Sequence, residues 1–486
     1  MNGRNYITFL LGQKEISINL EGRNHPFTRL IDHLRDEEGL RDVKEGCGVG
    51  DCGACTVVLA RPGPEGRLEY VPVNSCLLLL PMVHGCQVIT AAHLARNGIL
   101  HPVQQALVDH HGSQCGFCTP GLVMSMYALW MQDGTTDAVR IAKYLSGNLC
   151  RCTGYLPIID AMQTAMQSRD VPGFQTANEG AYSRLVQIRE DQAPIISGHL
   201  PHTYTKVFRL SDALDLLSAH PKTRIIAGNT DLGVKFRLPE EPTHYLDISG
   251  IAQINGIRYE AGFLELGAAR PLEKVRVDCR ESLPPLAEML DLYASTQVRH
   301  MATAGGSLGT ASPIGDLSPV LLAIGAEVVL QKAGQKRRMH LEDFITGYRT
   351  TALQAGEMIT HLHLPIPGPG HYNRAYKVSR RKEVDISSVS ACFSLEIEEG
   401  KVTDLRIAYG GMAAKPLRLR ATEELMLGEP WNNATVEEGM AHIRQSLHPI
   451  CDVRGDASTR SLVAGNLLRR FYLDSLEWQQ QQGPTL

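Results

Sequence analysis

The chain of 486 residues is 43% hydrophobic and 21% charged, which excludes a single small module and a fibrous or wholly disordered protein. Its 48 basic and 52 acidic residues give a formal net charge of −4. No long run of one sign interrupts that balance, so a nucleic acid held through its phosphates is not expected as a partner. At roughly 100–200 residues per domain, the length predicts about three or four domains.

Neither a membrane span nor a signal peptide is expected. The most apolar stretch, residues 76–94, is interrupted by Pro81 and two histidines, and the N-terminus leads directly into a strand-like pattern. A cytoplasmic location is therefore predicted. All of the 12 cysteines except Cys279, Cys392 and Cys451 lie within the first 152 residues. In a reducing compartment, such clustering indicates metal ligands rather than disulfides.

The first part of the chain has the pattern of a small α+β domain. Two strand-like runs on either side of Gly12-Gln13 predict a β-hairpin across residues 6–20. The other elements expected here are a short helix and two strands, at 28–35, 56–59 and 70–73. A domain is therefore predicted for residues 1–85.

A helical pattern follows. Thr119 fits an N-cap, Pro120 fits the first helical position, and Gly147 fits a C-terminal stop. The helices expected in this part of the chain are 103–110, 119–131, 136–145 and 156–166. A second, all-helical domain is predicted for residues 86–168.

The rest of the chain predicts a linker and two further domains. Residues 169–202 lack a sustained period and contain several prolines and glycines, which indicates a linker. Short strands and glycine turns predict a domain at 203–365. The Pro/Gly segment 365–370 predicts a hinge into an α+β domain at 366–486. Its expected strands are 391–397 and 402–407, and its expected helices are 436–447 and 457–472.

The first thiol set comprises Cys47, Cys52, Cys55 and Cys76. Its C-x4-C-x2-C spacing with a later fourth cysteine is typical of a plant-type [2Fe–2S] cluster, and the glycines within the loop allow backbone N–H groups to turn toward the sulfurs. A zinc ion, which is also bound by four thiolates, is one alternative to the cluster. The other alternative is that the four thiols are free. Residues 48–53 also read as G-x-G-x-x-G, but no buried strand precedes them and no helix begins there, so a dinucleotide site is rejected.

The second thiol set comprises Cys115, Cys118, Cys150 and Cys152. The expected helices place these two pairs at adjacent helix ends. Spacing alone leaves iron–sulfur and zinc equally open for this set. Cys86 fits neither set and is expected to be a buried core thiol.

Residues 114–121 and 148–155, around the second thiol set, resemble the second-cluster motifs of the molybdenum hydroxylases, and 45–55 resembles their first-cluster loop. The resemblance implies a β-grasp ferredoxin domain and a four-helix domain, each with a [2Fe–2S] cluster, and so implies iron rather than zinc in both sets. It also implies that Gln114 and Cys152 lie near the pterin of a molybdenum cofactor on another polypeptide.

Two glycine-rich stretches, 225–232 and 303–316, resemble the two FAD loops of the same family. The resemblance implies a non-Rossmann α+β FAD domain, and such turns can surround a pyrophosphate with N–H and O–H donors. Ser307 departs from the family, in which Asn is common. The residues that the resemblance assigns to FAD are Ile225, Ile226, Ala227, Gly228, Asn229, Thr230, Asp231, Leu232, Tyr293, Thr303, Gly306, Ser307, Thr310, Asp316, Ile359 and Lys377.

Residues 380–386 resemble the loop over the flavin where NAD binds in the xanthine dehydrogenases of this family. The implied contacts are Arg381, Asp385 and Ile386. A solvated charged turn is the alternative interpretation. No residue is assigned as a general acid or base, because the redox cofactors carry the chemistry. The histidines His300, His361 and His363 are expected to be ordinary core or surface residues.

In the order of its parts, the chain most resembles the small subunits of bacterial xanthine dehydrogenases. This implies transfer of electrons from hypoxanthine or xanthine oxidation, at a molybdenum-cofactor large subunit, through two [2Fe–2S] clusters and FAD to NAD+, within a heterotetramer of two small and two large subunits. One alternative is another molybdenum hydroxylase, acting on an aldehyde, carbon monoxide, an N-heterocycle or an aromatic thioester with a different acceptor. The other is a non-enzymatic iron–sulfur sensor or scaffold.

Overall fold

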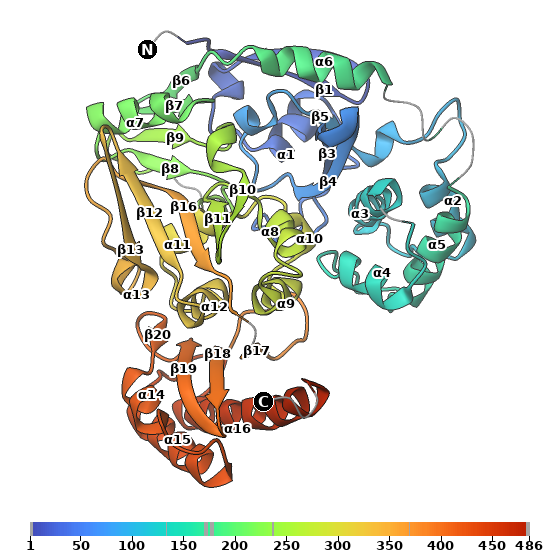
Figure 1. Ribbon diagram of the computed structural model, residues 1–486. Coiled ribbons are helices and arrows are strands. Elements are labelled where there is room, and N and C mark those ends of the chain that lie inside the picture. The colour runs from blue at the N-terminus through green and yellow to red at the C-terminus, as the bar shows by residue number, and fades with distance from the viewer. Residues whose placement is uncertain are drawn as a thin grey trace. The chain divides into compact units, whose positions relative to one another are not determined.

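The computed structural model describes residues 3–132, 134–169, 174, 179–235, 238–368 and 370–482. It is a multidomain α+β structure (Figure 1). Its contacts divide the chain into two compact units. The first unit comprises Met1–Leu216, Lys222–Ile251 and Ala294–Ala302, and the second comprises Leu217–Pro221, Ala252–Tyr293 and Thr303–Leu486. Each unit therefore contains part of the stretch 203–365.

The first unit begins with a five-stranded mixed sheet. Its strands are β1 (Tyr6–Leu11), β2 (Lys14–Asn19), β3 (Thr56–Pro62), β4 (Leu68–Asn74) and β5 (Gln87–Ile89), in the order β2-β1-β5-β3-β4. The predicted hairpin is confirmed, since β1 and β2 pair antiparallel around Gly12 in the left-handed region. The predicted helix at 28–35 is present as α1 (Leu30–Asp32), which continues as a π-helix over His33–Glu37.

Helices follow the first sheet, as predicted. They are α2 (Pro102–Asp109), α3 (Thr119–Gln132), α4 (Ala138–Leu145) and α5 (Leu156–Gln167). Residues 121–130 of α3 are all buried, which makes α3 the central helix of this group. The indole N–H of Trp130 donates to the Ala165 carbonyl at 3.1 Å and so fixes α3 to α5. The side chain of Asp137 caps α4 by accepting from the backbone N–H of Arg140.

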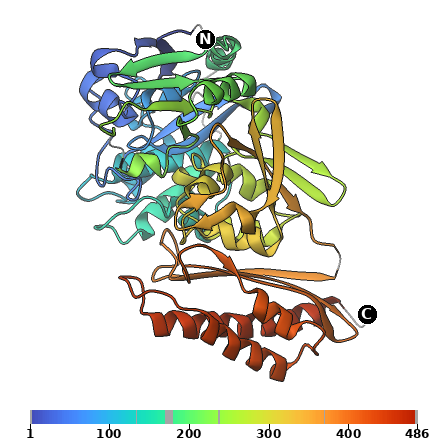
Figure 2. The same cartoon turned by 90° about the vertical axis from the view of Figure 1, so that its left-hand side faces the viewer.

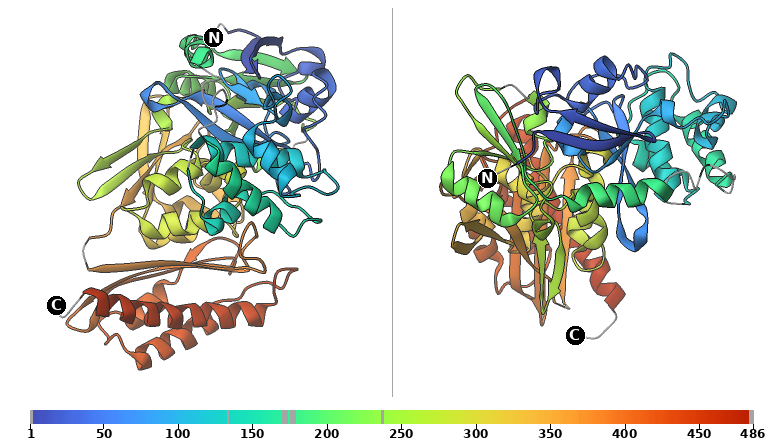
Figure 3. Two further views of the ribbon diagram at one scale, coloured as in Figure 1. Left: turned by 90° about the vertical axis from the view of Figure 1, so that its right-hand side faces the viewer. Right: turned by 90° about the horizontal axis from the view of Figure 1, so that it is seen from above.

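The prediction of a linker at 169–202 is wrong for much of that stretch. Helix α6 (Glu179–Glu190) and strand β6 (Ile195–His199) both lie within it. Ala181, Leu185 and Ile188 share one helical face and pack with Leu10 of β1; Figure 3 shows α6 in green beside the dark-blue strands. Prolines and glycines around this short stripe obscured its period. Pro172 and Gly173 lie outside the described residues.

A second sheet of the first unit carries the stretch that precedes the first glycine loop (225–232). Strand β6 is joined by β7 (His202–Lys206), β8 (Arg224–Ile226) and β9 (His244–Asp247), in the order β6-β7-β9-β8. The ammonium of Lys206 lies 3.0 Å from the carboxylate of Asp247 in the interior. Asp247 also accepts from the hydroxyl of Tyr204 at 2.5 Å. Burial and the negative charge of Asp247 raise the pKa of Tyr204 well above its usual value.

The second unit contains an antiparallel five-stranded sheet. Its order is β10-β11-β16-β12-β13, and its strands are β10 (Ile257–Glu260), β11 (Phe263–Gly267), β12 (Glu327–Lys332), β13 (Gln335–His340) and β16 (Met358–Pro365). The helices in this part of the chain are α8 (Leu272–Asp278), α9 (Pro284–Leu292), α11 (Ala304–Thr310), α12 (Leu317–Ala323) and α13 (Leu341–Phe344). The remaining short elements are β14 (Ile345–Gly347) and β15 (Thr350–Thr351) in the second unit, α10 (Thr296–Arg299) in the first, and α7 (Leu210–Ala219), whose residues are divided between the two.

The C-terminal part of the second unit is an antiparallel sheet covered by helices (Figure 2). The strands are β17 (His371–Val378), β18 (Val389–Glu398), β19 (Lys401–Gly410) and β20 (Leu417–Arg418), and the helices are α14 (Arg420–Met426), α15 (Asn433–Ser446) and α16 (Ala457–Gln482). Phe393 of the sheet packs against Phe471 of α16, with ring centroids 5.1 Å apart. The strands and helices predicted here are therefore confirmed, although α16 is longer than predicted. Pro369 of the predicted hinge lies outside the described residues.

Within the described part of the chain, none of the helices is both long enough and apolar enough to cross a bilayer.

The Lys206–Asp247 pair generates a stability prediction. The Lys206→Met variant should destabilise the first unit by about 3–5 kcal/mol, because it leaves the Asp247 carboxylate without its counter-charge in the interior. Urea unfolding followed by circular dichroism measures the change. Arg23→Gln is the matched control, because Arg23 is 90% exposed in its pair with Glu37, and it should cost no more than about 1 kcal/mol. Equal losses in the two variants would contradict this assignment.

Candidate functional site

The first thiol set comes together at the end of β4. The sulfurs of Cys55 and Cys76 lie 3.3 Å apart, and the thiols of Cys47 and Cys52 also interact with each other. Cys55 and Cys76 are buried, whereas Cys47 is exposed. The loop of residues 47–55 therefore supplies three thiols, and the turn after β4 supplies the fourth.

Backbone N–H groups point at this set, as its glycines predict. The N–H groups of Val49 and Asp51 donate to the Cys47 sulfur at 3.4 and 3.3 Å, and the side-chain amide of Asn74 donates to the Cys55 sulfur at 3.7 Å. Gly50 takes a φ of 76° within this loop, a conformation that favours glycine. These donors stabilise negative charge on sulfur.

The two buried thiols of the first set have pKa values shifted in opposite directions. The hydrogen bond with Cys76, which outweighs the opposing effect of burial, lowers the pKa of the Cys55 thiol to about 7. The same hydrogen bond, together with burial, raises the pKa of Cys76. Cys55 is therefore the first of this pair to become a thiolate, the form that ligates a metal.

The second thiol set lies at helix ends, as predicted. The thiols of Cys118 and Cys150 form one interacting pair, and those of Cys115 and Cys152 form another. Cys118 directly precedes α3. The backbone N–H of Cys150 donates to the hydroxyl of Tyr155 at 2.9 Å. Burial, followed by the hydrogen bond with Cys150, raises the pKa of Cys118 to about 12.

The thiols of both sets are therefore arranged as pairs. A [2Fe–2S] cluster takes two thiolates on each of its two irons, whereas a zinc ion draws four ligands around one centre. Among the residues that the structure describes, no three or more His, Cys, Asp or Glu side chains are grouped so as to hold a metal ion. The paired donor sets, with N–H groups directed at one of them, fit two-iron clusters.

The first glycine loop leaves β8 and is fixed to the first thiol set. The side-chain amide of Asn229 donates to the carbonyl of Leu77, the neighbour of Cys76, at 2.7 Å. Asn229 is buried with a φ of 57°. A Cβ on Gly228 would lie 1.8 Å from the carbonyl oxygen of Met301, so only glycine fits there. The loop then enters a 3-10 turn over Leu232–Lys235.

The second glycine loop (303–316) belongs to the second unit. The hydroxyl of Thr303 caps α11 by accepting from the backbone N–H of Gly306 at 3.0 Å. The N–H of Gly305 donates to the carbonyl of Ala268 at 2.9 Å, which fixes the loop to the chain after β11. Gly306 is exposed and Ser307 is half-buried, so this part of the loop is accessible from solvent.

Asp316, at the end of the second glycine loop, anchors two other segments of the second unit. Its carboxylate accepts from the ammonium of Lys377 at 2.9 Å and from the hydroxyl of Ser387 at 2.6 Å. Lys377 also donates to the carbonyl of Leu292 at 3.0 Å. Sequence reasoning selected Asp316 and Lys377 but missed Ser387, because a lone serine after a charged turn carries no motif. The role of Lys377 at a flavin stays a prediction.

The other predicted flavin residues of the second unit lie on separate elements. Tyr293 follows α9 and is half-buried, and Ile359 lies buried in β16.

The charged loop at 380–386 is held by hydrogen bonds between its own residues. The carboxylate of Asp385 accepts from the backbone N–H of Arg381 at 2.9 Å, and the Arg381 guanidinium donates to the Val384 carbonyl at 3.0 Å. Although burial raises the pKa of Asp385, hydrogen bonds from two backbone N–H groups lower it overall. Ile386 is exposed. This geometry fits a solvated turn and also leaves Ile386 accessible.

Gln114 is exposed beside the exposed thiol of Cys115. Among the histidines, His363 is buried and stacks on Phe263 with ring centroids 4.2 Å apart, and His361 lies 3.3 Å from the carbonyl of Gln253. These two contacts are those of structural histidines, as expected.

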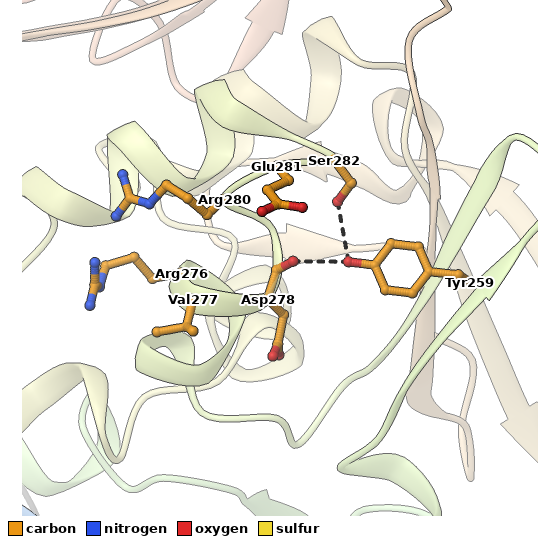
Figure 4. Close-up of a pocket in the computed structure, with 7 residues that line it drawn as sticks. All are labelled: Tyr259, Arg276, Val277, Asp278, Arg280, Glu281 and Ser282. Atoms are coloured by element: carbon orange, nitrogen blue, oxygen red, sulfur yellow. Dashed lines mark hydrogen bonds between the residues drawn. The ribbon is translucent and has the colours of Figure 1, made fainter. Parts of the chain in front are cut away.

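The second unit also has a surface cavity lined by residues outside the predicted site (Figure 4). The hydroxyl of Tyr259 donates to the carbonyl of Asp278 at 2.9 Å. Arg276 and Arg280 each bond to the carboxylate of Asp291 at 2.9 Å. Because that carboxylate already offsets their positive charge, the cavity offers no strong anion site.

Three stretches of the chain match family models. Residues 90–163 match a [2Fe-2S] binding domain, residues 200–367 match the FAD binding domain in molybdopterin dehydrogenase, and residues 374–475 match the CO dehydrogenase flavoprotein C-terminal domain. The chain therefore contains an iron–sulfur domain and a flavin domain.

Known proteins resemble the chain along most of its length. It is 30% identical to xanthine dehydrogenase/oxidase of Mus musculus over 97% of its own length, but it spans only 39% of that relative. Reconstituted CO dehydrogenase from Oligotropha carboxidovorans matches 56% of this chain and 96% of its own at 26% identity, with a TM-score of 0.52. Quinoline 2-oxidoreductase from Pseudomonas putida 86 shares the fold at 24% identity, with coverage of 57% of this chain and 96% of its own and a TM-score of 0.52.

The close contact at Gly228 gives a prediction for the first glycine loop. Gly228→Ala should destabilise the first unit by about 1–3 kcal/mol, because the new Cβ overlaps the Met301 carbonyl. Gly180→Ala in α6 is the control, because a Cβ there meets no atom within 4 Å, and it should be neutral or stabilising by less than about 1 kcal/mol. Urea unfolding midpoints of the two variants, compared with that of the wild type, measure these changes in stability. An unchanged Gly228→Ala midpoint would show that the loop relaxes freely.

Proposed function

Since the chain belongs to the molybdenum hydroxylase family, we propose that it is the electron-transfer subunit of a xanthine dehydrogenase, which oxidises hypoxanthine and xanthine to urate. When bound, the cofactors would supply the redox chemistry: the two [2Fe–2S] clusters would carry single electrons from a molybdenum centre on a partner, and FAD would convert them to a hydride for NAD+. The residues of this chain hold those cofactors and fix their order.

The observation that carries the proposal is the graded exposure of the two thiol sets. In the second set Cys115 and Cys152 are exposed and Cys150 is buried, whereas in the first set only Cys47 is exposed and Cys55 and Cys76 are buried. Cys76 of the first set directly precedes Leu77, whose carbonyl holds Asn229 of the first glycine loop. Electrons arriving from a partner would therefore enter at the second set and leave from the first set toward a flavin.

The resemblance assigns each of the two glycine loops to FAD. In the second loop the N–H groups of Gly305, Gly306 and Ser307 are already bonded within the second unit, so the half-buried hydroxyl of Ser307 is a donor there that suits an oxygen acceptor. Asn229 and Thr303 give each loop its local shape, the former through Leu77 and the latter through the N–H of Gly306. The ion pair with Asp316 would hold the ammonium of Lys377 beside the second loop. These roles follow the resemblance residue by residue.

The exposed thiols of the second set also support a protein partner. Phe117, Leu149 and Leu156 lie close to these cysteines in the sequence and are exposed, and exposed apolar side chains are typical of interaction surfaces where they form a patch. We assign this surface to a large subunit that carries the molybdenum cofactor, with Gln114 toward the pterin. A heterotetramer of two small and two large subunits is the proposed assembly.

A second candidate is another molybdenum hydroxylase with an acceptor other than NAD+. The match of residues 374–475 to a CO dehydrogenase flavoprotein domain, and the likeness to CO dehydrogenase itself, favour this candidate. It differs from the first only in substrate and acceptor, because both need the same two thiol sets and the same two glycine loops.

Anaerobic titration of the cofactor-loaded chain with NADH tests the proposal. We expect the flavin absorbance to bleach first, followed by two distinct [2Fe–2S] signals in low-temperature EPR. A chain that is not reduced by NADH but is reduced by dithionite would support the second candidate. A chain that binds no flavin would contradict both.

Replacing one ligand should separate the two ends of the relay. Cys150→Ser should remove one of the two EPR signals and abolish turnover from substrate to NAD+, because it takes a thiolate from the second set. Reduction of the flavin by NADH should persist. Cys451→Ser, at an exposed cysteine outside both sets, is the control and should change neither signal. Loss of both signals in Cys150→Ser would refute two independent clusters.

A further inference from the structure

The loops that carry the two thiol sets are joined by a backbone hydrogen bond within the first unit. The N–H of Leu149 donates to the carbonyl of Cys52 at 3.0 Å. Cys52 belongs to the first thiol set, and Leu149 directly precedes Cys150 of the second. One hydrogen bond and a short run of covalent bonds therefore connect a ligand of each proposed cluster.

An amide network surrounds this bond, and we define it as Gln297, Asn148, Ser125 and Thr56. All four side chains are buried. The side-chain amide of Asn148 donates to the carbonyl of Gly53, the residue after Cys52, at 3.0 Å. The hydroxyl of Ser125 donates to the amide oxygen of Asn148 at 2.6 Å. The network thus fixes the residue on one side of the Leu149–Cys52 bond to the residue on the other.

Gln297 closes the network from a distant part of the sequence. It lies in α10, just before the second glycine loop, and is fully buried. Its Nε2 donates to the amide oxygen of Asn148 at 2.7 Å and lies 3.0 Å from the hydroxyl of Ser125. Its Oε1 has no hydrogen-bond partner and would lie 2.2 Å from a Cβ on Gly147.

The polar side chain of Gln297 is not explained by core packing alone. A buried amide oxygen without a partner costs stability, and an apolar side chain would fill the same space without that cost. The polar end is useful only for what Nε2 does, which is to hold the oxygen of Asn148 and so direct the other end of that amide at Gly53. No motif in the sequence pointed to Gln297.

We propose that Gln297 is a positioning residue for electron transfer between the two clusters, acting through Asn148 on the Leu149–Cys52 hydrogen bond. Electron tunnelling decays more slowly through bonded atoms than through a gap, so the length of this hydrogen bond controls the rate. The inference rests on the proposed function, because it requires both thiol sets to hold clusters.

The test uses Gln297→Met in the full chain with its cofactors and its partner subunit. Methionine is similar in length but donates no hydrogen bond. Gln87→Met is the matched control, because Gln87 is also fully buried and its amide donates to the Gly12 carbonyl at 2.7 Å, outside the network. Iron content and the two EPR signals first establish that each variant holds both clusters.

Two readouts follow. Amide hydrogen exchange, resolved to Leu149, reports whether its bond to Cys52 persists. Reduction by a flash-generated deazaflavin radical, with rapid-freeze EPR, reports how fast an electron redistributes between the clusters without NADH or substrate. We expect Gln297→Met to speed Leu149 exchange several-fold and to slow redistribution several-fold. Gln87→Met should change neither.

The contrary outcomes are distinct. Faster exchange at Leu149 with unchanged redistribution would show that electrons do not use this bond, and unchanged exchange would show that Gln297 does not position it. If Gln297→Met fails to retain its clusters, Ser125→Ala, which removes one contact of Gln297 and one of Asn148, is judged by the same two readouts. If the wild-type chain shows no redistribution, the proposed relay itself fails.

Discussion

The first unit depends on a close approach of backbones that only glycine permits. A Cβ on Gly53 would lie 2.3 Å from the carbonyl oxygen of Gly147, and a Cβ on Gly121 would lie 2.3 Å from the carbonyl oxygen of Gly53. Any larger residue at these positions would force the loop of the first thiol set away from the helices of the second. The Leu149–Cys52 hydrogen bond exists because that distance stays short.

Polar side chains then make this approach specific. Asn148, Ser125 and Gln297 are buried between the loops, where each must find partners among the others. An apolar contact would tolerate sliding of one loop against the other, whereas hydrogen bonds to defined atoms do not. The same contacts explain why Ala294–Ala302 groups with the first unit although the second glycine loop that follows it does not. The flavin-type stretch of the sequence thereby contributes one helix to the iron–sulfur part.

The sequence predicted what is decided locally. The hairpin at 6–20 and the start of α3 at Thr119 follow from spacing and turn residues, and the structure has both. The partition of eight thiols into two cluster-binding sets stays a prediction, in line with the pairing of thiols within each set. Features that depend on contacts between distant parts of the chain were not predicted from the sequence. Helix α6 depends on burying Leu185 against Leu10, and the amide network depends on Gln297, which lies far along the chain from both thiol sets. No local pattern encodes such contacts.

Two ligands of the first thiol set, Cys52 and Cys76, each lie at or beside a backbone carbonyl that accepts a hydrogen bond from another segment. On one side the carbonyl of Cys52 accepts from the backbone N–H of Leu149, and on the other the carbonyl of Leu77, next to Cys76, accepts from the amide of Asn229. A backbone carbonyl beside a ligand cannot change rotamer, so it holds its partner at a more constant distance than a side chain would. In the proposed relay, the step between the two thiol sets and the step from the first set toward the flavin would therefore each cross a contact that is fixed by a backbone carbonyl beside a ligand of the first set.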